Sequence, residues 1–222
     1  MDLKKVAGER AVELVEDGMV VGLGSGTTAY YAIQKIGERV REGLRITGVC
    51  TSENTRLLAE RWKIPYVELN EVESIDLTID GADEVDPLGN GIKGGGGALL
   101  FEKIIASNSI QNIWVVEQRK LVEQLGAFPL PVEIMPFGYK HCLRNLSGLG
   151  LEPRLRMQGK DVYHTDGGHY IADLHTGAIQ DPHELDCELR RIPGVIEHGL
   201  FLNLANKVVI ASDQGTDIIT FR

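Results

Sequence analysis

The chain has 222 residues, of which 43% are hydrophobic and 25% charged, and its formal net charge at pH 7 is −9. This length fits one large domain, or one domain with a smaller companion. The acidic balance argues against a nucleic-acid partner, because phosphate backbones recruit lysine and arginine clusters. No apolar run approaches the ~20 residues of a membrane helix, and the charged N-terminal stretch MDLKKVAGERAVELV is not a secretory signal. We therefore expect no membrane partner, and the widely spaced cysteines without a CxxC pair indicate a cytoplasmic protein.

Predicted strands and helices alternate over the first 127 residues. The strands are expected at 19–24, 45–51, 66–69, 75–82 and 112–117, and the helices at 2–17, 28–40, 52–62 and 98–107. Strands that alternate with helices at this spacing indicate βαβ units and a parallel sheet. In such a sheet, ligands bind at the carboxyl ends of the strands. The chemically rich residues fall at those ends, at 24–28, 51–52 and 80–83.

The remaining residues follow a different order. The stretch FPLPVEIMPFG at 128–138 is rich in proline and marks a boundary. After it, strands are expected at 131–135, 152–157, 169–175 and 195–201, and helices at 139–148 and 184–194. This β-α-β-β-α-β order is that of a ferredoxin-like unit, and KVVIASD at 207–213 predicts a strand that returns to the first sheet. We therefore predict an α/β parallel-sheet domain of residues 1–127 plus 203–222, with a smaller α+β domain of residues 128–202 inserted into it.

The stretch GLGSGTT at 22–28 joins a predicted strand to a predicted helix and favours phosphate binding. Glycines let the backbone approach an anion, and the helix N-terminus offers free N–H groups and the positive end of its dipole. Ser25, Thr27 and Thr28 add hydroxyl groups beside Gly26. No lysine follows the last glycine, so the stretch is not a Walker loop, and its GxGxG spacing departs from the dinucleotide fingerprint GxGxxG. A dinucleotide site remains an alternative, because Glu53 stands where a ribose-binding acid is expected, and so does a purely structural turn.

A second stretch, IDGADEVDPLGNGIKGGGGALLFEK at 79–103, gathers carboxylates, lysines and a row of four glycines. Asp80 and Asp83 flank a tight turn at Gly81 and Ala82. Two neighbouring carboxylates repel, so one of them can hold its proton at neutral pH and act as an acid. Solvated loop positions are the plainer interpretation of these acids. A metal site is a third, but Asp80, Asp83 and Asp86 are spaced by three, whereas a calcium loop alternates its acids by two, and we expect no metal.

The second half of the same stretch carries groups suited to a developing negative charge. Lys93 precedes the glycine row with an ammonium that can stabilise an oxyanion. The row at 94–97 can present consecutive N–H groups to the same ligand. Glu102 lies one turn into the following predicted helix, and it is a candidate general base.

Three stretches together closely resemble ribose-5-phosphate isomerase of the A type: IDGADEVD, IKGGGGALLFEKIIA and GLGSGTT. The resemblance runs through nearly the whole chain, including TSENTRLLAE, FPLPVEIMPFG and EHGLF. It implies a Rossmann-like domain with a smaller α+β domain, and a homodimer or homotetramer. It also implies interconversion of ribose 5-phosphate and ribulose 5-phosphate through a cis-enediol(ate), without a metal or organic cofactor, in the non-oxidative pentose phosphate pathway.

The resemblance assigns roles residue by residue. Glu102 matches the general base that moves a proton between C1 and C2 of the sugar. Asp80 and Asp83 match the acids of ring opening and of the O1 and O2 protons, and Lys93 matches the lysine that steadies the enediolate. Lys4 and Lys120 match lysines near the phosphate, and the implied substrate-binding residues are Lys4, Ser25, Gly26, Thr27, Thr28, Asp80, Gly81, Ala82, Asp83, Lys93, Gly94, Gly95, Gly96 and Lys120.

The chain departs from the family pattern in two places. Members often carry Asp-x-Ser-Lys where this chain has EQRK, so Arg119 either contacts the phosphate or faces solvent. Many members carry Arg and Asp after GLF, where this chain has Leu204 and Asn206. The second departure concerns local packing or subunit contacts, and the chemistry is unaffected.

Other functions remain as alternatives. A sugar-phosphate sensor could use the same kind of domain, but a transcription regulator would need a helix-turn-helix segment that this chain has no room for, and binding alone would not need Glu102. A CoA transferase or an amino-sugar deaminase on a similar fold would not predict the full set of motifs. Cys50 precedes a strand end, and a buried structural thiol is the expected role for it.

Overall fold

The structure is a computed structural model that describes residues 2–221. By their internal contacts the residues form two compact units: unit 1 comprises Met1–Ala82, Phe101–Leu121 and Asn203–Arg222, and unit 2 comprises Asp83–Leu100 and Val122–Leu202. This division places residues 83–100 and 122–127 with the smaller unit, whereas the sequence prediction placed them with the larger domain. Whether the units fold as separate domains stays a prediction.

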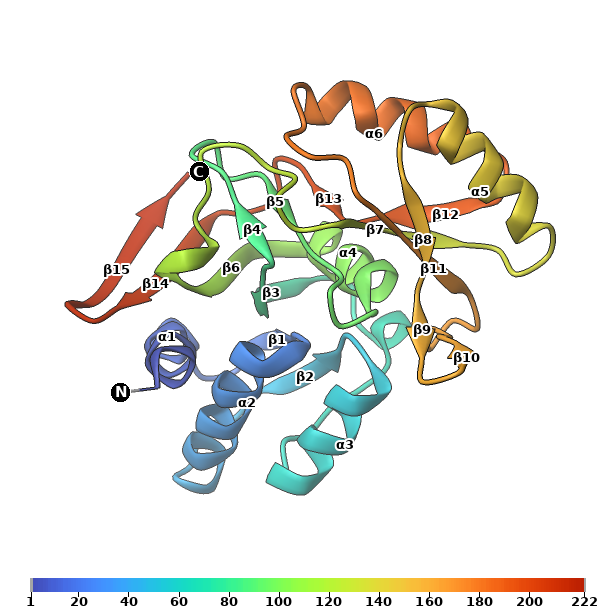
Figure 1. The fold of residues 1–222 in the computed structure, drawn as a ribbon. Coiled ribbons are helices and arrows are strands. Elements are labelled where there is room, and N and C mark those ends of the chain that lie inside the picture. The colour runs from blue at the N-terminus through green and yellow to red at the C-terminus, as the bar shows by residue number, and fades with distance from the viewer. Residues whose placement is uncertain (1, 222) are drawn as a thin grey trace. The chain divides into compact units, whose positions relative to one another are not determined.

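Unit 1 is built on a six-stranded sheet in the order β15-β14-β6-β3-β1-β2 (Figure 1). Its strands are β1 Val20–Leu23, β2 Thr47–Cys50, β3 Ile75–Gly81, β6 Ser109–Glu117, β14 Lys207–Ser212 and β15 Gly215–Thr220. All neighbouring pairs are parallel except the hairpin β14–β15. The predicted parallel sheet and the return of the chain through β14 are therefore confirmed.

One strand of the sequence prediction is wrong. Residues 66–69 were expected to form a strand, but only an isolated bridge between Gly48 and Tyr66 is present, followed by the 3₁₀ turn η1, Leu69–Glu71. Val67 still donates its N–H to the carbonyl of Gly48, but the chain then turns, so the segment YVEL is too short to form a strand. The antiparallel edge strand β15 was not predicted.

The helices are α1 Leu3–Val12, α2 Gly26–Arg41, α3 Glu53–Trp62 and α4 Leu99–Ser107, with the 3₁₀ turn η2 at Gln118–Lys120. Asp2 caps α1 by accepting the N–H groups of Lys4 at 3.1 Å and Lys5 at 3.4 Å. Such a cap satisfies donors that the helix leaves free. The cap fixes where α1 begins, and α1 ends at Val12, before the predicted end at Asp17.

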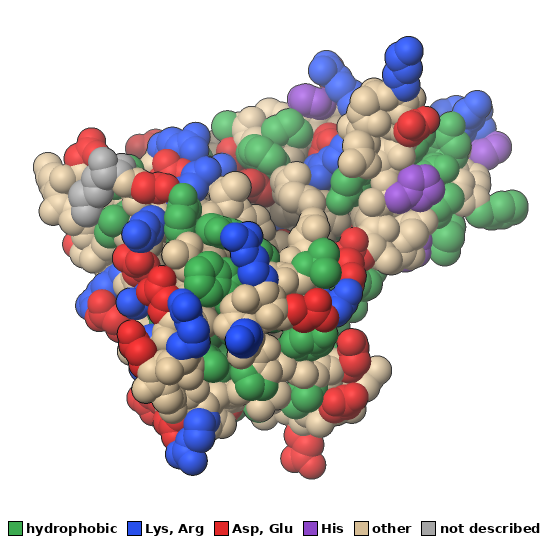
Figure 2. Space-filling model, turned by 90° about the horizontal axis from the view of Figure 1, so that it is seen from below, with side chains coloured by type: hydrophobic (Ala, Val, Ile, Leu, Met, Phe, Trp, Pro, Cys, Tyr) green, Lys and Arg blue, Asp and Glu red, His purple; other side chains and the backbone are tan. Residues whose placement is uncertain are grey.

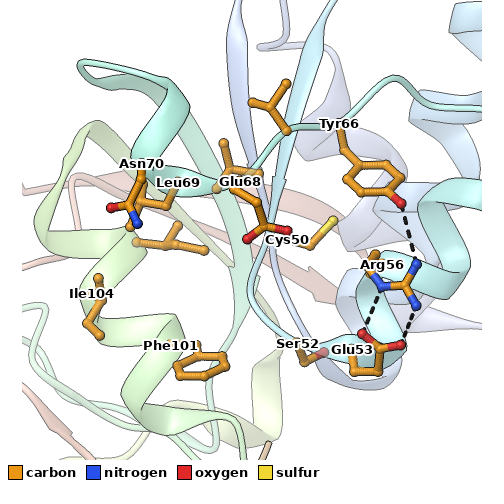
Figure 3. A pocket seen from close by; sticks show the side chains of 13 residues that line it. Cys50, Ser52, Glu53, Arg56, Tyr66, Glu68, Leu69, Asn70, Phe101 and Ile104 are labelled. Atoms are coloured by element: carbon orange, nitrogen blue, oxygen red, sulfur yellow. Dashed lines mark hydrogen bonds and ion pairs between the residues drawn. The ribbon is translucent and has the colours of Figure 1, made fainter. Parts of the chain in front are cut away.

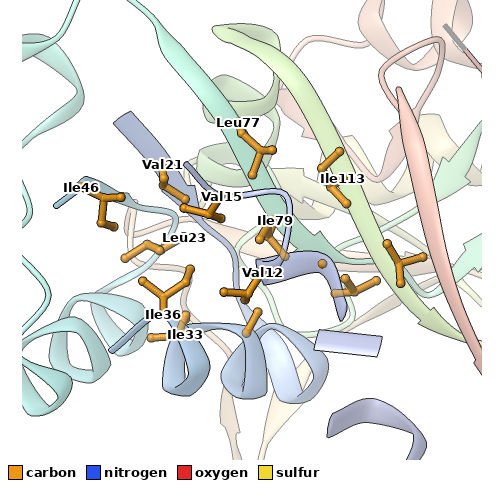
Figure 4. Close-up of a cluster of buried hydrophobic side chains, with 14 of the residues drawn as sticks. Val12, Val15, Val21, Leu23, Ile33, Ile36, Ile46, Leu77, Ile79 and Ile113 are labelled. Atoms are coloured by element: carbon orange, nitrogen blue, oxygen red, sulfur yellow. The ribbon is translucent and has the colours of Figure 1, made fainter. Parts of the chain in front are cut away.

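The core of unit 1 lies between this sheet and the helices α1 and α2 (Figure 4). Apolar residues of both layers are buried together: Val12, Val15, Val21, Leu23, Ile33, Ile36, Ile46, Leu77, Ile79 and Ile113. Burial of each such side chain contributes about 1.5–3 kcal/mol. This packing holds the carboxyl ends of β1 and β3 in place, and the polar loops of unit 1 follow directly from them.

Unit 2 contains a four-stranded antiparallel sheet in the order β12-β7-β11-β8. Its elements are β7 Leu130–Ile134, α5 Tyr139–Gly148, β8 Pro153–Leu155, β11 Tyr170–Leu174, α6 Pro182–Arg190 and β12 Val195–His198, with a small hairpin of β9 Met157–Gln158 and β10 Asp161–Val162. The predicted β-α-β-β-α-β order is confirmed, but the single strand predicted at 195–201 is wrong, because the chain divides there into β12 and a further strand of another sheet. The apolar face of the four-stranded sheet packs against α5 and α6, and Leu146, Ala172 and Leu189 are all fully buried there.

A second, three-stranded sheet of unit 2 was not predicted. It pairs β13 Leu200–Phe201 with β5 Gly91–Ile92, and β5 with β4 Glu84–Val85. Glu84 is 4% exposed, and its carboxylate accepts the N–H groups of Gly126 at 2.7 Å and Phe128 at 2.5 Å. This sheet therefore fixes the residues on either side of it, Asp83 before β4 and Lys93 after β5.

No helix within residues 2–221 is both long and apolar enough to cross a bilayer. On the face in Figure 2, lysine and arginine side chains lie among aspartate and glutamate side chains.

Candidate active site

The turn from β1 leads directly into the N-terminus of α2. Gly26 opens α2 at φ +86°, a conformation that favours glycine. Ser25 is the N-cap residue, but its side chain makes no capping hydrogen bond to the helix. The first N–H groups of α2 are thus left for a ligand, together with the positive end of the helix dipole.

A cluster of four hydroxyl groups, here called the hydroxyl cluster, holds this turn from behind. Ser25 Oγ lies 2.7 Å from Thr51 Oγ1, 3.0 Å from Ser52 Oγ and 3.4 Å from Thr55 Oγ1. Thr51 and Thr55 each donate a hydrogen bond of 3.0 Å to a carbonyl oxygen at the end of β1. Because those two protons are committed, Ser25 must donate its own proton inward, to Thr51 or Ser52. The Ser25 hydroxyl is therefore held within the hydroxyl cluster.

Asp80 ends β3 beside the same turn. It is 3% exposed, and its Oδ1 accepts the N–H groups of Ser25 at 2.9 Å and Gly81 at 2.8 Å. A Cβ on Gly24 would lie 2.3 Å from that oxygen, so only glycine fits there. Burial and two backbone donors show that Asp80 is not a solvated loop residue.

A basic group surrounds Glu117 at the end of β6. A shallow depression of about 850 Å³ is lined by Lys4, Gly26, Thr27 and Glu117 among others. The pKa of Glu117 is lowered, first by the hydrogen bond from Arg119 and further by the charges of Arg119, Lys4 and Lys120. Lys4, Lys120 and Arg119 therefore all bring positive charge close to Glu117.

The question about Arg119 has an answer in its contacts. Its Nε and Nη2 atoms each lie 3.0 Å from a carboxylate oxygen of Glu117, and its side chain is 68% exposed. Arg119 faces solvent and neutralises Glu117.

The other departure, Asn206, joins backbone segments: its Oδ1 accepts the N–H of Asn112 at 2.7 Å, and its carbonyl accepts the N–H of Phe221 at 2.9 Å.

Glu102 lies in the first turn of α4 and is 5% exposed. A glutamate is seldom buried to that degree on a helix whose only role is structural. A position on a solvated helix surface is therefore excluded for Glu102. A buried carboxylate is the kind of group that acid–base chemistry uses.

Lys93 and the glycine row lie in unit 2. The Lys93 side chain is 3% exposed, its N–H donates to the carbonyl of Gly199 at 2.9 Å, and its ammonium lies 5.1 Å from the centre of the Phe201 ring. Asp83 Oδ2 accepts the N–H of Gly95 at 2.8 Å. The backbone of the row and a predicted acid are thus in direct contact.

Three of the four glycines of the row are required by the fold, for different reasons. Gly94 and Gly97 have φ values of +103° and +86°, and a Cβ on Gly95 would lie 2.9 Å from the oxygens of Asp83. At Gly96, by contrast, a Cβ would meet no described residue within 4 Å apart from its chain neighbours, and φ is not positive. Only Gly96 is free of a requirement within the fold.

The predicted site residues divide between the two units. Unit 1 brings Ser25 and Asp80 into contact, and Lys4 close to Gly26 and Thr27. Unit 2 brings Asp83 and Gly95 into contact. Residues 51–52 were expected among the chemically rich strand ends, but no role was predicted for Thr51, and Thr55 was not singled out; the strand-end position of TSENT was the one available signal.

The spacing of acids that suggested a metal has a different cause. Asp86 Oδ1 accepts the N–H groups of Leu88 at 2.9 Å and Asn90 at 2.8 Å, so Asp86 closes the turn between β4 and β5. Over residues 2–221, no three His, Cys, Asp or Glu side chains are grouped so that they could hold a metal ion.

A separate pocket of unit 1, about 390 Å³ in volume, lies beside α3 (Figure 3). Arg56 forms ion pairs with Glu53 and Glu60 at its side, and Cys50 lies on its wall. Burial is the main cause that raises the pKa of Cys50 to about 12. The thiolate is the reactive form of cysteine, so the raised pKa disfavours a nucleophilic role for Cys50, whose side chain is half-buried.

The chain was compared with families and with solved structures. Residues 47–215 match the family model described as ribose 5-phosphate isomerase A (phosphoriboisomerase A). The ribose-5-phosphate isomerase A of Listeria monocytogenes serotype 4b (strain F2365) is 51% identical over 213 residues, which cover 96% of this chain and 95% of the relative. That of Streptococcus pneumoniae (strain Hungary19A-6) is 48% identical and covers 100% of this chain and 98% of its own.

Two solved structures are similar over nearly their whole length. Ribose 5-phosphate isomerase A from Methanocaldococcus jannaschii has a TM-score of 0.94 at 40% identity, and covers 99% of this chain and 98% of its own. A D-ribose-5-phosphate isomerase in complex with phospho-erythronic acid has a TM-score of 0.95 at 40% identity with the same coverage. The mixed α/β fold with a Rossmann-like core is therefore confirmed, and the chain belongs to the ribose 5-phosphate isomerase A family.

Proposed function

We propose the following account of the reaction. The chain is an aldose–ketose isomerase that interconverts D-ribose 5-phosphate and D-ribulose 5-phosphate. The observation that carries this function is the match to ribose-5-phosphate isomerase A over nearly the whole chain at about half identity, together with a similar structure that binds phospho-erythronic acid. Phospho-erythronic acid is a phosphorylated sugar acid. Its negatively charged carboxylate makes it an analogue of an enediolate.

The phosphate of the substrate binds at the N-terminus of α2. Gly26, Thr27 and Thr28 supply its first-turn N–H groups, and Lys4 and Lys120 supply positive charge. Helix N-termini bind phosphate in this way in many proteins. Ser25 contributes by holding the turn, because its hydroxyl and its N–H both point into unit 1.

Glu102 is the general base. Its carboxylate takes the proton from C2 of the open-chain aldose, which leaves an enediolate, and returns a proton to C1 to give the ketose. Its burial suits this role, because the carboxylate is held in a site from which water is largely excluded. Asp80 and Asp83 open the sugar ring and move the protons of O1 and O2, with Gly81 and Ala82 forming the turn between them.

Lys93 and the glycine row stabilise the enediolate oxygen. The ammonium of Lys93 is buried, and electrostatic stabilisation is strongest where water is excluded. The N–H of Gly96 donates to the enediolate oxygen, the N–H of Gly95 holds Asp83 in place, and Gly94 lies beside them in the substrate site. The pathway is the non-oxidative branch of the pentose phosphate pathway, and no cofactor takes part. The chain acts in the cytoplasm as a homodimer or homotetramer.

The test is turnover of ribose 5-phosphate by the purified chain and by Glu102→Gln. Gln keeps the shape of the side chain but cannot accept the proton, so kcat is expected to fall about 10²–10⁴-fold while KM changes little. Binding of ribose 5-phosphate without turnover by the unaltered chain would favour the sugar-phosphate sensor. Near-normal turnover by Glu102→Gln would place the base elsewhere, with Asp80 next.

A further inference from the structure

Arg156 contacts the glycine row from within unit 2. It lies between β8 and β9, and its Nη1 donates to the carbonyl oxygens of Gly94 at 3.0 Å and Gly95 at 3.1 Å. Its side chain is only 16% exposed. The resemblance to the isomerase family assigned no role to this residue, and the sequence places it about sixty positions after the row.

Asp173 on β11 fixes the orientation of the Arg156 guanidinium. Arg156 Nε donates to Asp173 Oδ2 at 2.9 Å, and Nη2 donates to Oδ1. A bidentate pair of this kind fixes both the position and the orientation of the guanidinium. The backbone N–H of Arg156 donates to Ile171 at 2.8 Å, so both ends of the residue are anchored to β11. Nη1 then points at the glycine row.

Peptide geometry connects this contact to the substrate side of the row. A trans peptide directs its N–H opposite to its C=O. When the carbonyls of Gly94 and Gly95 face Arg156, the N–H groups of Gly95 and Gly96 face the other way. The N–H of Gly95 meets Asp83 Oδ2 at 2.8 Å on that opposite side. The N–H of Gly96 is directed to the same side, where the backbone is exposed.

We propose that Arg156 is a positioning residue for the oxyanion site of the isomerase. It turns two successive peptides so that their N–H groups face Asp83 and the enediolate oxygen. A cation at the carbonyl end also polarises each peptide, which strengthens the N–H donor at the other end. This inference rests on the proposed function, and Arg156 itself does not touch the substrate.

The alternative is an ion pair that only stabilises the small sheet of unit 2. Such a pair would need Asp173 and the strands, but it would not need the two carbonyls of the glycine row. Tyr163 adds to the same contact, since its hydroxyl lies 3.4 Å from the carbonyl of Gly96 and its ring lies 5.8 Å from the guanidinium carbon of Arg156. Arg156 therefore belongs to a group of side chains gathered on the carbonyl face of the row.

The test compares Arg156→Met with the control Arg154→Met. Arg154 lies on β8, its side chain is 69% exposed and it pairs only loosely with Glu152, at 3.9 Å. Loss of one oxyanion donor costs about 10²–10³-fold in kcat, so misplacement of donors by Arg156→Met is expected to lower kcat at least ~10-fold. KM for ribose 5-phosphate and the affinity for inorganic phosphate should stay close to those of the unaltered chain. Affinity for phospho-erythronic acid should fall with kcat, because its carboxylate carries a negative charge like that of the enediolate.

Two further variants guard against a simple folding defect. Arg156→Lys keeps a cation near the carbonyls and should recover part of the lost kcat. Asp173→Asn keeps the shape of its side chain but weakens the bidentate pair, and it should lie between Arg156→Met and the unaltered chain. If Arg156→Met and Arg154→Met have equal kcat and equal affinity for phospho-erythronic acid, the role assigned to Arg156 is overturned. The proposed function of the chain would still stand. No turnover by the unaltered chain would overturn the proposed function, and this inference with it.

Discussion

The backbone N–H of Ser25 donates to Asp80 Oδ1 at 2.9 Å, which joins the N-cap of α2 directly to the acid at the end of β3. One residue thus supports two tasks of the proposed site, phosphate binding at α2 and proton handling at Asp80. Its hydroxyl is held in turn by the hydroxyl cluster. Through Ser25, the other hydroxyl groups of the cluster therefore influence the position of Asp80, which they do not touch.

Removal of a hydroxyl from the cluster should weaken phosphate binding more than catalysis. Thr55 is 2% exposed and bonds both to Ser25 and to the end of β1. Thr55→Val keeps its volume but leaves buried partners unsatisfied, which costs about 1–3 kcal/mol of unfolding free energy. KM for ribose 5-phosphate should rise more than kcat falls, as steady-state kinetics would measure.

Two variants control that experiment. Thr55→Ser keeps the hydroxyl and should restore most of KM. Thr47→Val changes a threonine at the far end of β2, away from the cluster, and should leave KM unchanged. An equal rise of KM in Thr47→Val and Thr55→Val would show that the effect is a general loss of stability.

Alanine substitutions at two positions of the glycine row should distinguish a glycine needed for the fold from one needed for substrate contact. Gly96→Ala meets open space and a permitted φ, so the melting temperature should stay the same while kcat/KM falls because a methyl group enters the substrate side. Gly94→Ala should instead lower stability by at least about 1–2 kcal/mol, since its φ of +103° disfavours a Cβ. Thermal denaturation and kinetics on both variants measure this; full activity in Gly96→Ala would remove that glycine from the substrate contacts.

Lys120 and its neighbour Arg119 should respond differently to truncation. Lys120→Ala removes a charge proposed to attract the phosphate, so KM should rise, and the rise should shrink at high salt as ions screen the attraction. Arg119→Ala removes a solvent-exposed partner of Glu117 and should change KM far less. A larger effect at Arg119 would make it the phosphate contact.

The thiol of Cys50 should resist alkylation. Because burial raises its pKa to about 12, almost no thiolate exists at pH 8, and its reaction rate should rise only as pH approaches that value. Exposed Cys187 should react first, as mass spectrometry of peptides after iodoacetamide treatment would show. In the unfolded chain all three cysteines should react alike; preferential labelling of folded Cys50 would contradict its burial.

Much of the fold was predictable because its elements carry strong local patterns. The buried strands ending at Leu23 and Gly81 are apolar runs followed by glycine and acids, and the motifs that follow them marked Asp80 and Ser25. The small sheet containing β4 and β5 was not predictable, because two-residue strands leave no periodic pattern.

The supporting contacts of the site were also hidden in the sequence. Arg156 lies about sixty residues from the glycine row, and nothing local distinguishes it from the exposed Arg154. Thr51 and Thr55 look like an ordinary strand end and helix start. Their role depends on the distance to Ser25 Oγ, which only the folded chain defines.

The most direct test of the account is proton NMR of the purified chain with ribose 5-phosphate in deuterated buffer containing a chelator. We predict that ribulose 5-phosphate appears, with some deuterium on the carbon beside the carbonyl, because Glu102 exchanges its proton with solvent between the two transfers. Absence of conversion in the chelator, or equally fast conversion by Glu102→Gln, would contradict isomerisation through an enediol with Glu102 as the base.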